Sequence, residues 1–188
     1  MISQNCYLCD KMAKCTTPEA WKKFIECETC GEYEVTEELA HWALRGSSIL
    51  NKENKFVLSG LCRELKETEQ EFPCLTAENL SELMSRSMVP DMQDINAKLV
   101  KLLAAVKRRS DHFGKIVELS RDNDYPLAYA KNAVEFFAFI DQLVAMKLLE
   151  LKEEDNRTKF VMLSASCWAH PSNKMDNEES STEIGFKV

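Results

Sequence analysis

Cys6-Tyr-Leu-Cys9 and Cys27-Glu-Thr-Cys30 decide how the first part of this chain folds. The 17 residues 10–26 separate the two pairs. Two residues between cysteines let both thiolates of one turn face the same ion, and a second such turn completes the tetrahedron that Zn²⁺ accepts. Gly31 follows the second pair, where a positive φ is often needed, and Asp10 holds the equivalent place after the first. The spacing predicts a structural zinc site made by Cys6, Cys9, Cys27 and Cys30.

Other uses of these cysteines fit the sequence less well. A thioredoxin-like redox site needs one Cys-x-x-Cys beside a βαβ pattern, which is absent here. A disulfide scaffold suits a secreted chain, but the first residues lack the basic and apolar regions of a signal peptide. Three further cysteines are expected to be small core side chains, namely Cys62, Cys74 and Cys167. Cys15 stays open, either as a core residue or as a substitute ligand.

The sequence offers no set of residues for catalysis. His41, His112 and His170 are dispersed, so neither a catalytic thiol with its base nor an HNH-type nuclease is indicated. No acid/base pair, Gly-rich phosphate loop or activated nucleophile is recognisable. We therefore expect these residues not to form an enzyme.

Composition and charge restrict the location and the partners. The chain of 188 residues is 45% hydrophobic and 29% charged, as is ordinary for one or two soluble domains. Its longest apolar run is interrupted by Glu135, Asp141 and Lys147, so we expect no membrane span and a cytoplasmic location. The net charge is −7, and residues 91–170 carry 12 basic and 12 acidic side chains. This balance disfavours phosphate binding, although it leaves DNA possible.

The pattern along the chain predicts an α+β protein that is mainly α with small β elements. Residues 1–35 are predicted to form a zinc ribbon, in which Thr17–Trp21 makes a helical turn with Pro18 at its first position, and strands run on either side of Cys27 and Cys30. Residues 36–90 are expected to be a helical connector, with helices beginning after Thr36 and near Lys52.

Residues 91–170 have the element order of a winged helix. A helix to about Arg109 is followed by a short strand or helix start at 114–119, by a short helix at Tyr125-Pro126, and by a long helix capped by Asn132. Two strand-like runs, 148–152 and 159–163, then form the wing. Residues 171–188 are predicted to be a linker that ends in Ile184-Gly-Phe-Lys-Val188, the start of a further domain.

Two sets of motifs together resemble a known arrangement of bacterial proteins. Cys-x-x-Cys … Cys-x-x-Cys-Gly-x-Tyr-x-Val, ending at Val35, is similar to a bacterial zinc-ribbon head, and Tyr125-Pro-Leu-x-Tyr-Ala-x-Asn132 with the long helix and wing looks like the winged-helix region that follows it. Such regions precede a TIR-like or deoxyribosyltransferase-like effector domain in stress and antiphage defence proteins. Met146-Lys147 and Cys167 depart from the usual glycines. The resemblance implies antiviral defence and carries over no catalytic residue.

These observations predict a non-catalytic, zinc-stabilised binding or scaffold module that contacts a protein partner or a second copy of itself. The alternative is a DNA-binding winged-helix transcription regulator. Its recognition helix would lie within residues 133–149, where Lys147 is the one basic residue against Glu135 and Asp141. Four large apolar residues at 136, 137, 139 and 140 are too many for one buried stripe, so we expect this helix to be covered on more than one side.

Overall fold

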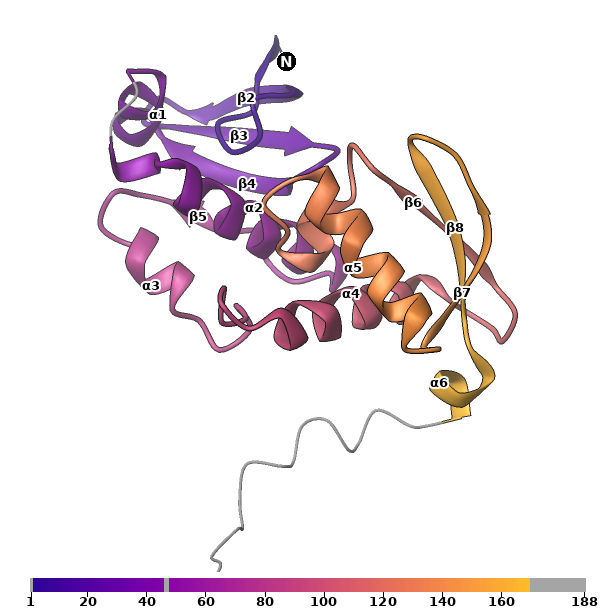
Figure 1. The fold of residues 1–188 in the computed structure, drawn as a ribbon. Coiled ribbons are helices and arrows are strands. Elements are labelled where there is room, and N and C mark those ends of the chain that lie inside the picture. The colour runs from indigo at the N-terminus through magenta and orange to yellow at the C-terminus, as the bar shows by residue number, and fades with distance from the viewer. Residues whose placement is uncertain (1, 46–47, 170–188) are drawn as a thin grey trace, which may run out of the picture.

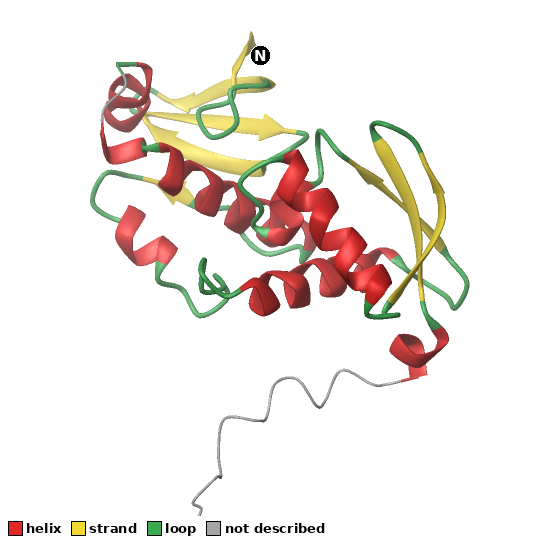
Figure 2. Ribbon diagram, in the orientation of Figure 1, coloured by secondary structure: helices red, strands yellow, loops and turns green. Residues whose placement is uncertain are grey.

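The computed structural model describes residues 2–45 and 48–169, and it is an α+β fold with two separate sheets. Figures 1 and 2 show most of the helical structure lying between the two sheets, with the N-terminal sheet on one side and the C-terminal sheet on the other. Gly46, His170 and the predicted linker with its terminal run Ile184–Val188 lie outside the described residues.

The N-terminal sheet has five strands in the order β1-β2-β3-β4-β5. All neighbours are antiparallel except β4 and β5, which are parallel. The strands are β1 (Ile2–Asn5), β2 (Met12–Glu19), β3 (Lys22–Cys27), β4 (Gly31–Thr36) and β5 (Cys74–Leu75). The last of these strands comes from the predicted helical connector, which therefore also contributes to the sheet.

The helical turn predicted at Thr17–Trp21 is wrong. Thr17 and Pro18 belong to β2, and only Ala20 and Trp21 form the turn to β3. The pairing of these two strands shifts register between Thr16 and Glu19, which indicates a bulge. A bulge is one of the few places in a sheet where proline, with no N–H to donate, is tolerated. The same proline had favoured a helix start in the sequence.

The middle of the chain covers one face of the N-terminal sheet. Its elements are α1 (Glu37–Leu44), the 3-10 turn η1 (Ser48–Leu50), α2 (Lys52–Glu67) and α3 (Leu80–Met84). The predicted cap of α1 is confirmed, because the Thr36 side chain accepts from the backbone N–H of Leu39. Helix α2 packs against β4, and one apolar core joins the sheet to this helix through residues such as Ile25, Tyr33 and Leu61.

The C-terminal part has the predicted order of elements and a three-stranded antiparallel sheet, β6-β8-β7. The elements are α4 (Ile95–Arg109), β6 (Ile116–Ser120), the 3-10 turn η2 (Tyr125–Ala128), α5 (Ala133–Ala145), β7 (Leu149–Glu154), β8 (Thr158–Leu163) and α6 (Ala165–Ala169). The cap of α5 is confirmed, since the Asn132 side chain accepts from the N–H groups of Val134 and Glu135. For residues 114–119 the sequence left a strand or a helix start open, and the structure has the strand β6 there.

A second apolar core lies among α4, α5 and the C-terminal sheet. Phe136, Phe139 and Ile140 are buried in it, and Phe137 is half-buried against it. These large residues leave α5 covered on more than one side, as expected. Tyr129 follows η2 in this part of the chain, yet its buried ring belongs to the first core. The boundaries predicted after residues 35 and 90 stay predictions.

Candidate metal centre

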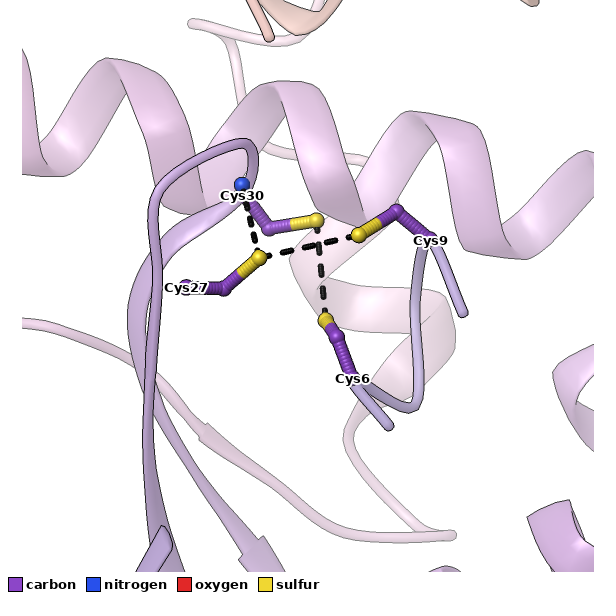
Figure 3. A group of neighbouring side chains, drawn as sticks. All are labelled: Cys6, Cys9, Cys27 and Cys30. Carbon is purple, nitrogen blue, oxygen red and sulfur yellow. Dashed lines mark hydrogen bonds between the residues drawn. The ribbon is translucent and has the colours of Figure 1, made fainter. Parts of the chain in front are cut away.

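The four predicted ligands meet at one end of the N-terminal sheet. Cys6 and Cys9 lie in the turn between β1 and β2, whereas Cys27 ends β3 and Cys30 directly precedes β4. Because β2 and β3 are antiparallel neighbours, the two turns emerge at the same end of the sheet. Figure 3 shows the four side chains pointing toward one another from the two turns.

The sulfur positions match a tetrahedral thiolate site. All four Sγ atoms lie within 4.8 Å of one another. Sγ of Cys6 is 3.7 Å from Sγ of Cys30, and Sγ of Cys9 is 3.6 Å from Sγ of Cys27. A tetrahedron with Zn–S bonds of about 2.3 Å has sulfur–sulfur edges of about 3.8 Å. These two distances are close to the edges of such a tetrahedron, and we refer to the four residues as the four-cysteine cluster.

The backbone of each turn has the conformation that the sequence suggested. Asp10 has φ 61° and Gly31 has φ 88°, so the residue after each cysteine pair is left-handed. In the first turn, the N–H of Cys6 donates to the carbonyl of Lys11 at 2.7 Å, and the N–H of Asp10 donates to the carbonyl of Cys6 at 3.0 Å. Gly31 is also required by close packing, because a Cβ there would lie 2.8 Å from the carbonyl oxygen of Cys62 on α2.

Three groups can donate hydrogen bonds to the sulfurs. The Tyr33 hydroxyl lies 3.1 Å from Sγ of Cys6, the Ser59 hydroxyl donates to Sγ of Cys30 at 3.1 Å, and the N–H of Cys30 donates to Sγ of Cys27 at 3.5 Å. Tyr33 also accepts from the N–H of Tyr7 at 3.2 Å, which orients its hydroxyl. Donors of this kind hold thiolate ligands in place and spread their negative charge.

Burial and neighbouring sulfurs shift the pKa values in the cluster. Hydrogen bonds from Cys30, Cys6 and Cys9 lower the pKa of the Cys27 thiol. The Cys30 thiol has its pKa raised well above the ordinary value, chiefly by its hydrogen bond with Cys27. Burial, followed by the charge of Cys6, raises the pKa of Tyr33, so its hydroxyl keeps the proton that it can donate. The sulfurs thus compete for protons, and a divalent cation would relieve this competition.

The remaining candidate residues lie apart from the cluster. Among the described residues, the group of potential ligands contains neither Cys15 nor a histidine. Cys15 is buried in the sheet, and its Sγ donates to the carbonyl of Thr16 at 3.9 Å. Cys62 is fully buried, as predicted for a core side chain, while Cys74 and Cys167 are only half-buried. His112 is exposed and pairs with Asp111.

Sequence reasoning missed Tyr33 and Ser59, which contact the sulfurs. The sequence does indicate that Tyr33 is buried, because side chains of the strand after Cys30 alternate between the two faces and Tyr33 lies on the buried face. Ser59 gave none, since it reaches the cluster from α2, 29 residues further along the chain than Cys30. Only the packing of this helix against the second turn brings its hydroxyl to the sulfur.

We found no family model, no curated protein and no solved structure that matches this chain. The fold and the site therefore define it only as an α+β protein with a four-cysteine cluster beside N-terminal β-hairpins, a zinc-ribbon-like arrangement. No helix within residues 2–45 and 48–169 is long and apolar enough to cross a membrane.

Proposed function

We propose that this chain is a non-catalytic, zinc-stabilised binding and scaffold module of the reducing cytoplasm. The observation that carries the proposal is the approach of four sulfurs to within 4.8 Å of one another. Four thiolates are a closed coordination set for Zn²⁺, which leaves no position for a substrate or an activated water. The ion would thus act on folding, because its binding free energy becomes folding free energy.

The surface of α5 supports a protein partner over DNA. Helix α5 contains no lysine or arginine between Ala133 and Ala145, whereas a helix that reads a DNA groove needs cationic and polar groups on its outer face. Its exposed residues are Val134, Ala138, Asp141, Gln142 and Ala145. Lys159 of β8, which pairs with Asp141, is buried and so offers no free cation to this surface. Such a surface suits contact with another protein or with a second copy of this chain.

The winged-helix interpretation of residues 91–170 belongs to this proposal. Its support is the order of elements from α4 to β8 and the strand order β6-β8-β7. The proposed role as the regulatory part of a bacterial defence effector rests only on the motif resemblance, and no comparison adds to it. A DNA-binding transcription regulator is the second candidate, favoured by the same order of elements.

Metal analysis of the reduced full chain tests the zinc site. We expect one zinc per chain, loss of the ion in Cys6→Ser and Cys30→Ser, and a lower Tm for both variants. Cys167→Ser is the matched control, because this half-buried cysteine lies outside the cluster. Full-chain protein that binds no zinc, or cluster variants that melt like Cys167→Ser, would refute the proposal.

A salt series separates the two candidate partners. The scaffold proposal predicts only weak binding to a DNA duplex at about 50–200 mM salt. It also predicts protein association, seen either as a molecular mass that rises with concentration in sedimentation analysis or as capture of a protein partner. A regulator would bind the duplex with an affinity that falls steeply with salt, because each neutralised phosphate releases a counterion.

A further inference from the structure

One turn of the C-terminal part contacts both turns that carry the cysteines. We call residues 121–124 the docking turn, and residues 6–11 and 27–31 the knuckle turns. Oδ1 of Asn123 accepts from Nζ of Lys11 at 3.3 Å and from the hydroxyl of Thr29 at 3.1 Å. Lys11 ends the first knuckle turn, and Thr29 lies between the cysteines of the second. A single oxygen, more than 90 residues away in the chain, thus joins the two halves of the metal centre.

Lys11 strengthens this contact in two further ways. Its ammonium group donates to the hydroxyl of Thr29 at 3.3 Å and to the carbonyl of Asp122. It also lies 5.4 Å from the centroid of the Tyr125 ring, directly after the docking turn. Thr29 is 1% exposed, so its hydroxyl depends on Lys11 and Asn123, which are themselves half-buried, for hydrogen bonds.

A second connection runs from the knuckle through α2. Arg63 donates to the carbonyls of Glu28 and Thr29, and its Nη2 lies 2.9 Å from Oδ1 of Asp124. The Asp124 carboxylate also accepts hydrogen bonds from Nη2 of Arg109 at 2.9 Å and from the N–H of Ser120 at 2.8 Å. With 9% of its side chain exposed, this carboxylate needs both guanidinium groups. The docking turn is thereby tied to the second knuckle turn and to α4.

These contacts require the two knuckle turns to hold their present spacing. An ion shared by Cys6, Cys9, Cys27 and Cys30 would fix that spacing, because it would bind two sulfurs from each knuckle turn. We infer that metal binding at the four-cysteine cluster controls the docking of residues 121–124, and through them the attachment of the C-terminal part. The inference rests on the proposed zinc site and adds a regulatory role to it. Because coupling between sites is reciprocal, the docked turn must in return retain the metal.

The rate of zinc transfer to a chromophoric chelator tests this coupling on the full, zinc-loaded chain. We expect Asn123→Ala to release zinc about 10-fold faster than wild type, within the range of roughly 5–150-fold that is typical of coupling between two sites. Asn156→Ala is the matched control, because Asn156 is exposed in the turn between β7 and β8 and contacts Arg121 through its backbone carbonyl, which alanine keeps. Equal release rates for all three proteins would overturn the inference.

Hydrogen exchange supplies the readout in the other direction. On stepwise removal of zinc by EDTA, peptides covering residues 116–130 should lose protection before peptides covering residues 99–106 of α4. Unchanged exchange in residues 116–130, or simultaneous loss in both segments, would contradict a specific release of the docking turn. Either failure with one zinc bound per chain rejects only the coupling, whereas absence of zinc from the reduced protein rejects the proposed function itself.

Discussion

The ring of Tyr129 occupies the space in which a side chain at position 60 would lie. A Cβ built on Gly60 would be 2.4 Å from Cδ1 of Tyr129, closer than any relaxed contact. Tyr129 follows η2 in the C-terminal part with φ 49°, and its hydroxyl donates to Oε2 of Glu64 at 2.9 Å. The glycine within α2 is therefore a socket that lets one aromatic ring of the C-terminal part enter the N-terminal core.

Gly60→Ala should destabilise the protein although it improves the helix. Alanine is about 1 kcal/mol better than glycine inside a helix. Overpacking against the buried ring of Tyr129 is expected to outweigh this gain and to leave a net cost of about 1–2 kcal/mol. Urea unfolding at saturating zinc measures the difference, with Gln142→Ala at an exposed position of α5 as the control. A stabilised Gly60→Ala variant would show that the ring moves aside without cost.

This socket illustrates what the sequence could and could not predict. The clustering of the four cysteines, the caps Thr36 and Asn132 and the order of elements after residue 91 all depend on local spacing, and the structure agrees with these predictions. In the sequence, Gly60 is only a residue unfavourable inside a helix, because its partner Tyr129 is 69 residues away. The Asn123 contacts and the pairing of β5 with β4 were missed for the same physical reason, since no local pattern encodes which distant segments will pack together.

Removing the Tyr33 hydroxyl should weaken metal binding. Tyr33→Phe loses the donor to Cys6 and leaves the buried N–H of Tyr7 without its acceptor. We expect zinc affinity to fall by about 10-fold, as is typical when a group that orients a ligand is removed. Competition with a chromophoric chelator measures it. Tyr7→Phe is the control, since its hydroxyl contacts Lys23 at 3.4 Å instead of a sulfur. Equal affinities for the two variants would mean that the hydroxyl has no influence on the site.

Glu67 should make the junction between α2 and α4 sensitive to acid. Its Oε1 lies 2.7 Å from Nη2 of Arg109 and 3.2 Å from Nε of Arg63. Burial favours the neutral acid, but the hydrogen bond and charge of Arg109 outweigh it and lower the pKa of Glu67 from 4.5. A pKa lowered in the folded state stabilises the fold above the unfolded value, and this contribution is lost as the pH falls through the folded pKa.

The variant Glu67→Gln isolates this contribution. At pH 7 it should cost about 1.5–3 kcal/mol, the range for hydrogen bonds to charged groups. The difference from wild type should shrink as the pH falls below about 4.5, the ordinary pKa of the carboxyl group. Zinc loss in acid affects both proteins and cancels in their difference. Glu71→Gln, at an exposed position, serves as the control. A difference independent of pH would assign the effect to packing.

The ion pair between buried Lys98 and half-buried Glu135 should respond unequally to loss of either partner. Only 3% of the Lys98 side chain is exposed, its Nζ lies 3.2 Å from Oε1 of Glu135, and it contacts the faces of Phe56 and Phe139. Glu135→Gln leaves this ammonium group buried without a counter-charge, at a cost of about 3 kcal/mol. Lys98→Met removes the charge and fills the same apolar space, while Glu135 is 27% exposed and keeps the hydrogen bond that its Oε2 accepts from the N–H of Lys131 at 2.6 Å.

Lys98→Met should therefore change the free energy of unfolding by less than about 1 kcal/mol, and adding it to Glu135→Gln should recover most of the loss. Urea unfolding of the two single variants and the double variant completes the cycle. Since Lys98 belongs to α4, Phe56 to α2 and Phe139 to α5, the result decides what joins α4 to these neighbouring helices at Lys98. Equal costs for the two single variants would mean that the charge pair holds them together, whereas the predicted asymmetry assigns that role to the apolar contacts around the lysine stem.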